Sequence, residues 1–200
     1  MKHYEKAFYQ ISGHSRGWSF SANDFITVYT RDRIDEQLKY LAKIGKIRRI
    51  CRGIYDYPKY SELLKQYLSP DIDQVAYAYS RKFNWRIEIS GESALNPLGL
   101  STQVPGRYLY LSDGPNRSYD IMGTILEFKK SVLKDIGFKH KESSLIVQAL
   151  KALGKERISE NIIAQIRSKI DAKLFKTILK DTSTSTGWIY DAIKQICQED

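Results

Sequence analysis

Residues 31–57 read RDRIDEQLKYLAKIGKIRRICRGIYDY, and within this stretch the hydrophobic pattern changes from helical to extended. Four apolar residues recur at helical intervals: Ile34, Leu38, Leu41 and Ile44. This spacing predicts an amphipathic helix over residues 31–44 that buries one face. Gly45 comes next, and glycine readily adopts the left-handed conformation that ends helices, so we expect the helix to stop there.

The residues after this glycine predict a short hairpin that carries basic side chains. The segment KIRRI at 46–50 is typical of a strand, and Arg52 with Gly53 supplies a turn. Residues 54–57 then form the returning strand, which Pro58 ends because proline cannot donate to a strand ladder.

Two shorter helices are expected before residue 31. Tyr4, Phe8 and Ile11 fall on one face of the first, which ends at Gly13, and an extended stretch over residues 18–20 follows.

Ser21 begins the second of these helices as its N-cap, and Asp24 completes a capping box three residues later. Phe20 and Phe25 have the spacing of a hydrophobic staple, and the helix is expected to reach about Tyr29. Three helices followed by a basic hairpin predict a winged helix-turn-helix domain over residues 1–68.

The distribution of charge points to a polyanionic partner. The chain of 200 residues has a formal net charge of +9, from 32 Lys and Arg against 23 Asp and Glu. Residues 1–69 hold 13 cations and 7 acids, a net of +6, and Lys43–Arg52 holds five cations and no acid. Concentrated charge is evidence for a polyanion-binding surface, although a solvated face is the alternative explanation.

In a winged helix-turn-helix protein the third helix enters the major groove and the hairpin lies along neighbouring phosphates. The acids on that helix, Asp32, Asp35 and Glu36, count against such contacts, although a pair such as Asp35 with Lys39 neutralises part of the charge. The predicted DNA-binding residues are Arg31, Arg33, Gln37, Tyr40, Lys43, Lys46, Arg48, Arg49 and Arg52. The alternative is a protein-interaction module with little or no sequence-specific DNA binding.

Residues 69–200 predict a mixed α+β domain whose C-terminal half is helical, so the fold class is α+β. A linker helix is expected over residues 60–68, followed by a helix over 72–83 that Asp71 caps. Short strands are expected at 86–89, 107–111 and 124–129. A short helix over 93–98 and four later helices are also expected, the latter over 144–153, 160–168, 172–179 and 188–197.

Four lysines near the C-terminus recur at i, i+4, i+7 and i+11: Lys169, Lys173, Lys176 and Lys180. On one helix they would form a narrow stripe. The stripe is either a solvated face or a secondary surface for DNA or an acidic partner.

Other classes of function find no support in the sequence. Two cysteines, Cys51 and Cys197, are too few for a disulfide framework or a thiolate zinc site, so we expect no metal and no cofactor. The sequence GESA at 91–94 lacks the downstream acid and histidine in the arrangement that a hydrolase needs, so no catalytic residues are predicted and we expect the chain not to be an enzyme. No apolar run approaches the length of a membrane span, and a cytoplasmic protein is expected.

Three segments carry a resemblance to a known family: GKIRRICRGIY at 45–55, ISGESALNPLGL at 89–100 and VPGRY at 104–108. Together they resemble the AbiEi-family antitoxins of type IV toxin–antitoxin systems. The resemblance implies an N-terminal winged helix that represses its own operon, and a C-terminal α+β domain, residues 69–200 here, required for antitoxicity. It also implies a nucleotidyltransferase-like toxin as the functional partner, neutralised without a stable complex. The alternative is neutralisation by direct docking.

A single helix-turn-helix contacts only a small half-site. We therefore expect operator DNA with an inverted repeat, bound by a homodimer or by two copies that cooperate on the DNA.

Overall fold

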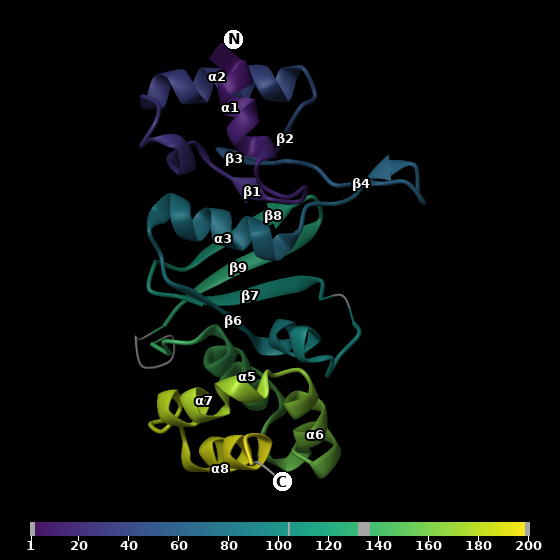
Figure 1. Cartoon of the computed structure of the whole chain (residues 1–200), viewed down its shortest axis with the longest axis vertical. Helices are drawn as coiled ribbons and strands as arrows, with labels where there is room; N and C mark the ends of the chain where they lie inside the picture. The colour runs from purple at the N-terminus through teal and green to yellow at the C-terminus, as the bar shows by residue number, and fades with distance from the viewer. Residues whose placement is uncertain (1–2, 104, 132–136, 199–200) are drawn as a thin grey trace. The chain divides into compact units, whose positions relative to one another are not determined.

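The computed structural model describes residues 3–103, 105–131 and 137–198, and the fold is mixed α+β (Figure 1). The chain divides into two compact units. The first contains Met1–Trp85 and Tyr119–Leu126, and the second contains Arg86–Ser118 and Glu127–Asp200. The predicted boundary at residue 68 is therefore wrong, because the helix that follows it packs within the first unit.

The first unit places three helical segments and a small sheet in the first 56 residues. These are α1 (His3–Ser12), β1 (Ser19–Phe20), η1 (Ala22–Phe25), α2 (Arg31–Lys43), β2 (Arg48–Cys51) and β3 (Ile54–Asp56). They are followed by β4 (Tyr60–Ser61), β5 (Gln66–Tyr67) and α3 (Ile72–Phe83). The sheet has the order β1-β3-β2, with both pairs antiparallel. Helix α3 packs on β1 and η1, which explains why it belongs to this unit.

Helix α2 ends one residue before the predicted end, at Lys43, and has most of the predicted buried face. Ile34, Leu38 and Leu41 are fully buried, and Gly45 has a φ of 72°, as expected for a residue that ends a helix. Ile44 was predicted to be buried but is 42% exposed, because it follows the last turn of the helix.

The capping box at Ser21 is confirmed, but the helix that it begins is shorter than predicted. The Ser21 hydroxyl accepts from the Asn23 N–H at 3.2 Å, and Asp24 accepts from the Ser21 N–H at 2.8 Å. The segment is a single 3-10 turn, η1, that ends at Phe25. Residues 26–28, Ile-Thr-Val, are all β-branched, and such residues lose side-chain freedom in a helix.

Residues 60–67 form a β-hairpin, so the predicted linker helix over 60–68 is wrong. Tyr60 pairs with Tyr67 and Ser61 with Gln66, and the two tyrosine rings meet edge to face at 5.3 Å. Lys65 has a φ of 52°, which reverses the chain between the strands. This cross-strand aromatic pairing stabilises the hairpin.

The remaining strands form one sheet of order β6-β7-β9-β8, in which β6 and β7 pair antiparallel. They are β6 (Ile87–Ser90), β7 (Arg107–Ser112), β8 (Arg117–Ile121) and β9 (Thr124–Lys130). Three of them were predicted, but β8 was missed because its sequence, RSYDI, has only a weak strand pattern. The predicted helix over 93–98 is two 3-10 turns, η2 (Gly91–Ala94) and η3 (Asn96–Leu98), since Pro97 cannot sit inside a regular helix. Val104, the first residue of the VPGRY segment, lies outside the described residues.

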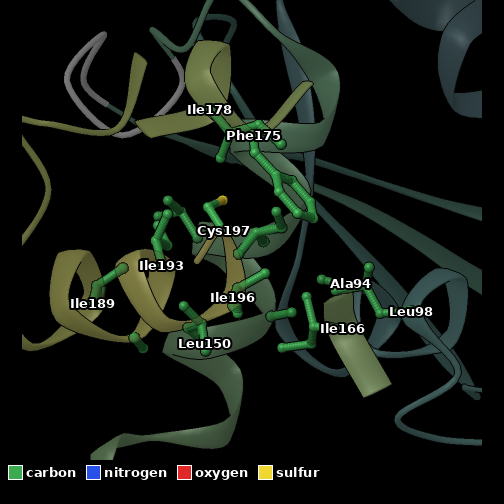
Figure 2. Packing of buried hydrophobic residues seen from close by; sticks show 14 residues of the cluster. Ala94, Leu98, Leu150, Ile166, Phe175, Ile178, Ile189, Ile193, Ile196 and Cys197 are labelled. Carbon is green, nitrogen blue, oxygen red and sulfur yellow. The ribbon is translucent and has the colours of Figure 1, made fainter. Parts of the chain in front are cut away.

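The second unit ends in the four predicted helices. They are α5 (Lys141–Leu153), α6 (Glu160–Ser168), α7 (Phe175–Asp181) and α8 (Gly187–Ile196), with the short turns η4 (Lys155–Arg157) and η5 (Ala172–Leu174) between them. Figure 2 shows Leu150, Phe175, Ile178, Ile193 and Ile196 from three of these helices gathered in one buried cluster. This cluster is the core of the unit.

Candidate nucleic-acid interface

The outward face of α2 carries cations of the predicted site. Arg31, Arg33 and Lys43 are exposed on it, and Lys46 is exposed just beyond its C-terminus. Tyr40 is 43% exposed, and its ring lies 4.7 Å from the ring of Tyr4 on α1. Helix α2 therefore presents these five side chains to solvent, as the sequence predicted.

The acidic residues of α2 offset the positive charge of its exposed face mainly in the first half of the helix. Arg31 forms an ion pair with Asp35 at 3.0 Å and also donates to the side chain of Asn23 in η1. Asp32 and Glu36 are exposed in the first half of the helix, while Lys39 and Lys43 are exposed in the second half. The positive end of the exposed face is therefore the one next to Lys46 and the hairpin β2–β3.

Two of the three predicted hairpin arginines are exposed, and the third is not available. Arg49 and Arg52 are exposed. Arg48 instead faces Asp56 across the strand pair, with Nε–Oδ1 at 3.0 Å and Nη2–Oδ2 at 2.5 Å, and it also donates to the Leu68 carbonyl at 2.9 Å. The prediction that Arg48 contacts phosphate is therefore wrong, because adjacent residues of a strand point to opposite faces.

The buried carboxylate of Asp56 requires the ion pair with Arg48. The Asp56 carboxylate is 1% exposed, and burial raises its pKa above the usual value while the Arg48 guanidinium opposes that rise. An unpaired carboxylate at this depth would be strongly destabilising. Arg48 is therefore a structural residue of the sheet.

Gln37 is also misplaced by the sequence prediction. It lies on the buried face of α2 with only 7% of its surface exposed, and neither side-chain amide atom has a hydrogen-bond partner within the described ranges. The sequence prediction assigned it to base contact because it lies in the N-terminal half of the helix, whereas its position three residues after Ile34 and four before Leu41 places it on the core-facing side. Gln37 cannot reach a base edge from there.

Lys82, near the end of α3, is a cation that the sequence analysis missed. Its Nζ donates to the Arg52 carbonyl at 3.2 Å, next to the turn of the hairpin. Burial lowers its pKa, and the positive charges of Arg31 and Arg52 lower it further, although Cys51 and Asp35 act in the opposite direction. The structure therefore brings cations from α2, the β2–β3 turn and α3 within electrostatic reach of one another.

The hairpin turn fits closely around this lysine. Gly53 has a φ of 74°, and a side chain at this position would place its Cβ only 2.9 Å from Lys82 Nζ.

The sequence contains one signal for Lys82, the pair Arg81-Lys82 in the last turn of a predicted helix, where cations interact favourably with the helix dipole. We call Arg31, Arg33, Lys43, Lys46, Arg49, Arg52 and Lys82 the basic surface of the first unit.

The lysines of the second unit do not form the predicted stripe. Lys169 follows the last residue of α6, Lys173 lies in η5, and Lys176 and Lys180 lie in α7. All four are exposed, but they belong to three elements. The four lysines do not lie on one helix, because Asp171 caps a new turn by accepting from the Lys173 N–H at 3.0 Å.

Neither a metal-binding cluster nor a membrane-spanning helix is assembled among the described residues. Within residues 3–103, 105–131 and 137–198, no group of three or more His, Cys, Asp or Glu side chains is placed to hold a metal ion. No helix in the described part of the chain has the length and apolar character needed to cross a membrane. Asp71 and Asp73, which resemble paired metal-binding carboxylates in sequence, begin α3, and Asp71 accepts from two N–H groups of its first turn.

These features define a mixed α+β protein with a basic surface on its N-terminal unit. The chain belongs to a family of unknown function, DUF6088, whose profile matches residues 6–178. The crystal structure of the RV2827C protein from Mycobacterium tuberculosis is similar to it, with a TM-score of 0.45 and 14% sequence identity, over 98% of this chain and 76% of that chain. No curated protein matches the chain.

Proposed function

We propose that the first unit is a winged helix-turn-helix domain that binds double-stranded DNA. The observation that carries the proposal is the order α1-β1-η1-α2-β2-β3, with β1 paired to β3 and the basic surface on α2 and the β2–β3 hairpin. In this arrangement α2 is the recognition helix and the hairpin is the wing. An α-helix is narrow enough to enter the major groove, where each base pair presents a distinct pattern of donors and acceptors.

The two parts of the basic surface have different tasks in this proposal. Arg33 and Tyr40 lie on one flank of α2 and contact base edges, which sets sequence preference. Arg49, Arg52 and Lys82 contact phosphates and fix the register of the protein on the duplex without reading sequence. Arg48 supports the wing from behind through its ion pair with Asp56.

We further propose that the chain is a transcriptional repressor and antitoxin of a type IV system that acts in the cytoplasm. This step is supported by the resemblance of residues 45–55 and 89–100 to AbiEi-family antitoxins. It implies autorepression at an inverted repeat and protection against a nucleotidyltransferase-like toxin, with residues of the second unit required for protection.

DNA binding is tested by a mobility shift with the DNA upstream of the protein's own gene. The wild type should bind this fragment more tightly than a shuffled fragment of the same composition. Arg33→Ala should reduce the preference between the two fragments, whereas Arg49→Ala with Arg52→Ala should weaken binding to both fragments alike. Equal binding of wild type to both fragments would reject operator recognition.

The antitoxin step is tested separately by co-expression with the product of the neighbouring gene. Growth inhibition by that product, relieved by the wild-type chain, is the expected result. If the wing double variant still relieves inhibition while DNA binding is lost, protection does not depend on repression. Stable co-purification of the two proteins would instead favour the direct-docking alternative.

A further inference from the structure

The β4–β5 hairpin ends in a tip that is apolar and exposed. Leu63 is 90% exposed and Leu64 is 56% exposed, and the two are flanked by Glu62 and Lys65. Figure 1 shows the hairpin reaching out sideways from the strands of the first unit. Contiguous exposed apolar surface is typical of a contact site. We call residues 62–65 the tip.

One hydrogen bond closes the tip, and two arginines hold the segments on either side of the hairpin. The Leu64 N–H donates to the Ser61 hydroxyl at 3.2 Å, and the Leu68 N–H closes the base of the hairpin on the Lys59 carbonyl at 2.8 Å. Arg48 donates to the Leu68 carbonyl at 2.9 Å, and Arg16 donates to the Pro58 carbonyl at 3.0 Å. A tip held in this way loses little conformational freedom when it binds.

A groove on the same unit is lined mainly by apolar residues and is therefore complementary to the two leucines of the tip. It lies between α1 and the end of α2, has a volume of about 570 Å³, and is lined by five apolar residues: Tyr4, Phe8, Tyr9, Leu41 and Ile44. Tyr9 is 75% exposed and Ile44 is 42% exposed, so much of this apolar surface faces solvent. We call this the α1–α2 groove.

The charges at the tip and the groove also match. Glu5 and Lys46 line the groove, and Lys46 Nζ lies 5.6 Å from the centroid of the Phe8 ring. The tip carries one acid and one cation, Glu62 and Lys65, which pair with each other at 3.4 Å while both are largely exposed. An exposed pair of this kind contributes little to stability, so its members can exchange partners readily.

We propose that the tip of one copy of this chain occupies the α1–α2 groove of a second copy. Leu63 and Leu64 bury their side chains among the apolar residues of the groove, Glu62 lies towards Lys46, and Lys65 lies towards Glu5. Two copies that exchange tips satisfy both contacts at once, which closes the assembly as a symmetric dimer. The high exposure of Leu63 shows that its own chain does not cover it.

This proposal does not depend on DNA binding. Leu63, Leu64 and Tyr9 lie outside the basic surface, so variants at these positions keep all the cations assigned to DNA. Self-association is measured in the absence of DNA, so its result is separate from that of the DNA-binding test. If both proposals hold, the tip exchange supplies the two copies that an inverted repeat requires; Lys46, which lines the groove, then pairs with Glu62, and the other cations of the basic surface contact DNA.

The test is the oligomeric state of the full-length chain, measured by light scattering and sedimentation over a range of concentrations. The wild type should form a dimer. Leu63→Ser with Leu64→Ser should weaken dimerisation by at least about 100-fold, since each tip then loses two buried leucines and every 1.4 kcal/mol is a factor of ten. Tyr9→Asp in the groove should also weaken it. Ile26→Ser is the matched control, because Ile26 is 54% exposed and lies outside both surfaces.

A cross-linking experiment identifies the contact itself. Leu63→Cys and Tyr9→Cys, placed on separate copies and mixed under oxidising conditions, should form a disulfide-linked pair that neither variant forms alone in comparable yield. All the substituted residues are exposed, and circular dichroism verifies that the variants are folded. A monomeric wild type, or a dimer that the tip variant leaves unchanged, would overturn the proposal.

Discussion

The basic residues of the first unit and the lysines of the second unit have similar patterns in the sequence but different arrangements in the structure. In the first unit, cations from α2, the β2–β3 turn and α3 lie close enough for Arg31 and Arg52 to lower the pKa of Lys82. In the second unit, Lys169–Lys180 is divided among three elements. A concentrated positive potential therefore depends on which elements meet, and regular spacing along the chain does not guarantee it.

A second contrast separates two neighbours in β2. Arg48 and Arg49 are adjacent in a run of cations, yet Arg48 pairs with the buried Asp56 and Arg49 is exposed. The alternation of side chains along a strand assigns one of them to stability and the other to the surface. The following predictions test these two contrasts, beginning with the largest effect.

Arg48→Ala should lower the free energy of unfolding by about 3 kcal/mol, because it leaves the Asp56 carboxylate buried without its partner. Urea denaturation at pH 7 measures the change. Arg49→Ala is the matched control and should change the free energy by less than about 0.5 kcal/mol. Equal, small effects of the two substitutions would contradict the structural role of Arg48.

Lys82→Ala should weaken binding to any DNA sequence by up to about tenfold at low salt, as expected for the loss of one phosphate contact. Lys176→Ala, an exposed lysine of the second unit, is the control and should leave the affinity unchanged. Fluorescence anisotropy with a labelled duplex measures both. A larger loss of DNA affinity in Lys176→Ala than in Lys82→Ala would indicate that the second unit, and not the first, contacts DNA.

The pH dependence of binding should also depend on Lys82. Its pKa is lowered from 10.5 by burial and by nearby cations, so its charge is lost at a lower pH than that of an ordinary lysine. DNA affinity should therefore fall as the pH rises through that lowered value, before exposed lysines titrate. Lys82→Arg keeps its charge and should flatten this part of the profile. Superimposable profiles would exclude a contact between Lys82 and DNA.

Gln37→Leu should raise the free energy of unfolding by about 1 kcal/mol, because it replaces a buried amide that lacks hydrogen-bond partners within the described ranges with an apolar group. It should leave the relative affinities for different duplexes unchanged. Arg33→Ala, on the exposed side of the same helix, should change those relative affinities. A change in the relative affinities of Gln37→Leu for different duplexes would instead support the predicted contact between Gln37 and DNA.

Asp181→Asn should have the smallest effect, a loss of about 0.5 kcal/mol at pH 7. Burial acts to raise the pKa of Asp181, but hydrogen bonds from the Lys139 and His140 N–H groups outweigh it, so the pKa is lowered below 3.8. A carboxylate with a lowered pKa stabilises the folded state above its unfolded value and loses that effect as the pH falls through the folded value. The difference between variant and wild type in urea denaturation should therefore shrink below about pH 4.

Features set by local sequence were predicted well. The bounds of α2 and α3, the Asp71 cap, the Ser21 capping box and the four C-terminal helices all follow from hydrophobic spacing and from residues that cap the chain within a few positions. These interactions join residues that are close in sequence, so a short stretch of sequence is enough to predict them.

Features set by tertiary contacts were missed. The tyrosine pair of the β4–β5 hairpin, the ion pair of Arg48 and the burial of Gln37 depend on which surfaces meet after folding. Lys82 was missed for the same reason, since only the structure brings the end of α3 to the hairpin turn. Six of the seven members of the basic surface were therefore predictable from the sequence, whereas Lys82, the buried role of Arg48 and the burial of Gln37 were not.

The central claim, that the basic surface of the first unit binds double-stranded DNA, is tested most directly by the salt dependence of binding. The slope of the logarithm of the association constant against the logarithm of salt concentration counts the phosphates that the protein neutralises. Arg49→Ala with Arg52→Ala should make this slope shallower by about 2, whereas Lys173→Ala with Lys176→Ala should leave it unchanged. An unchanged slope for the first variant, or an equal change in both, would contradict the claim.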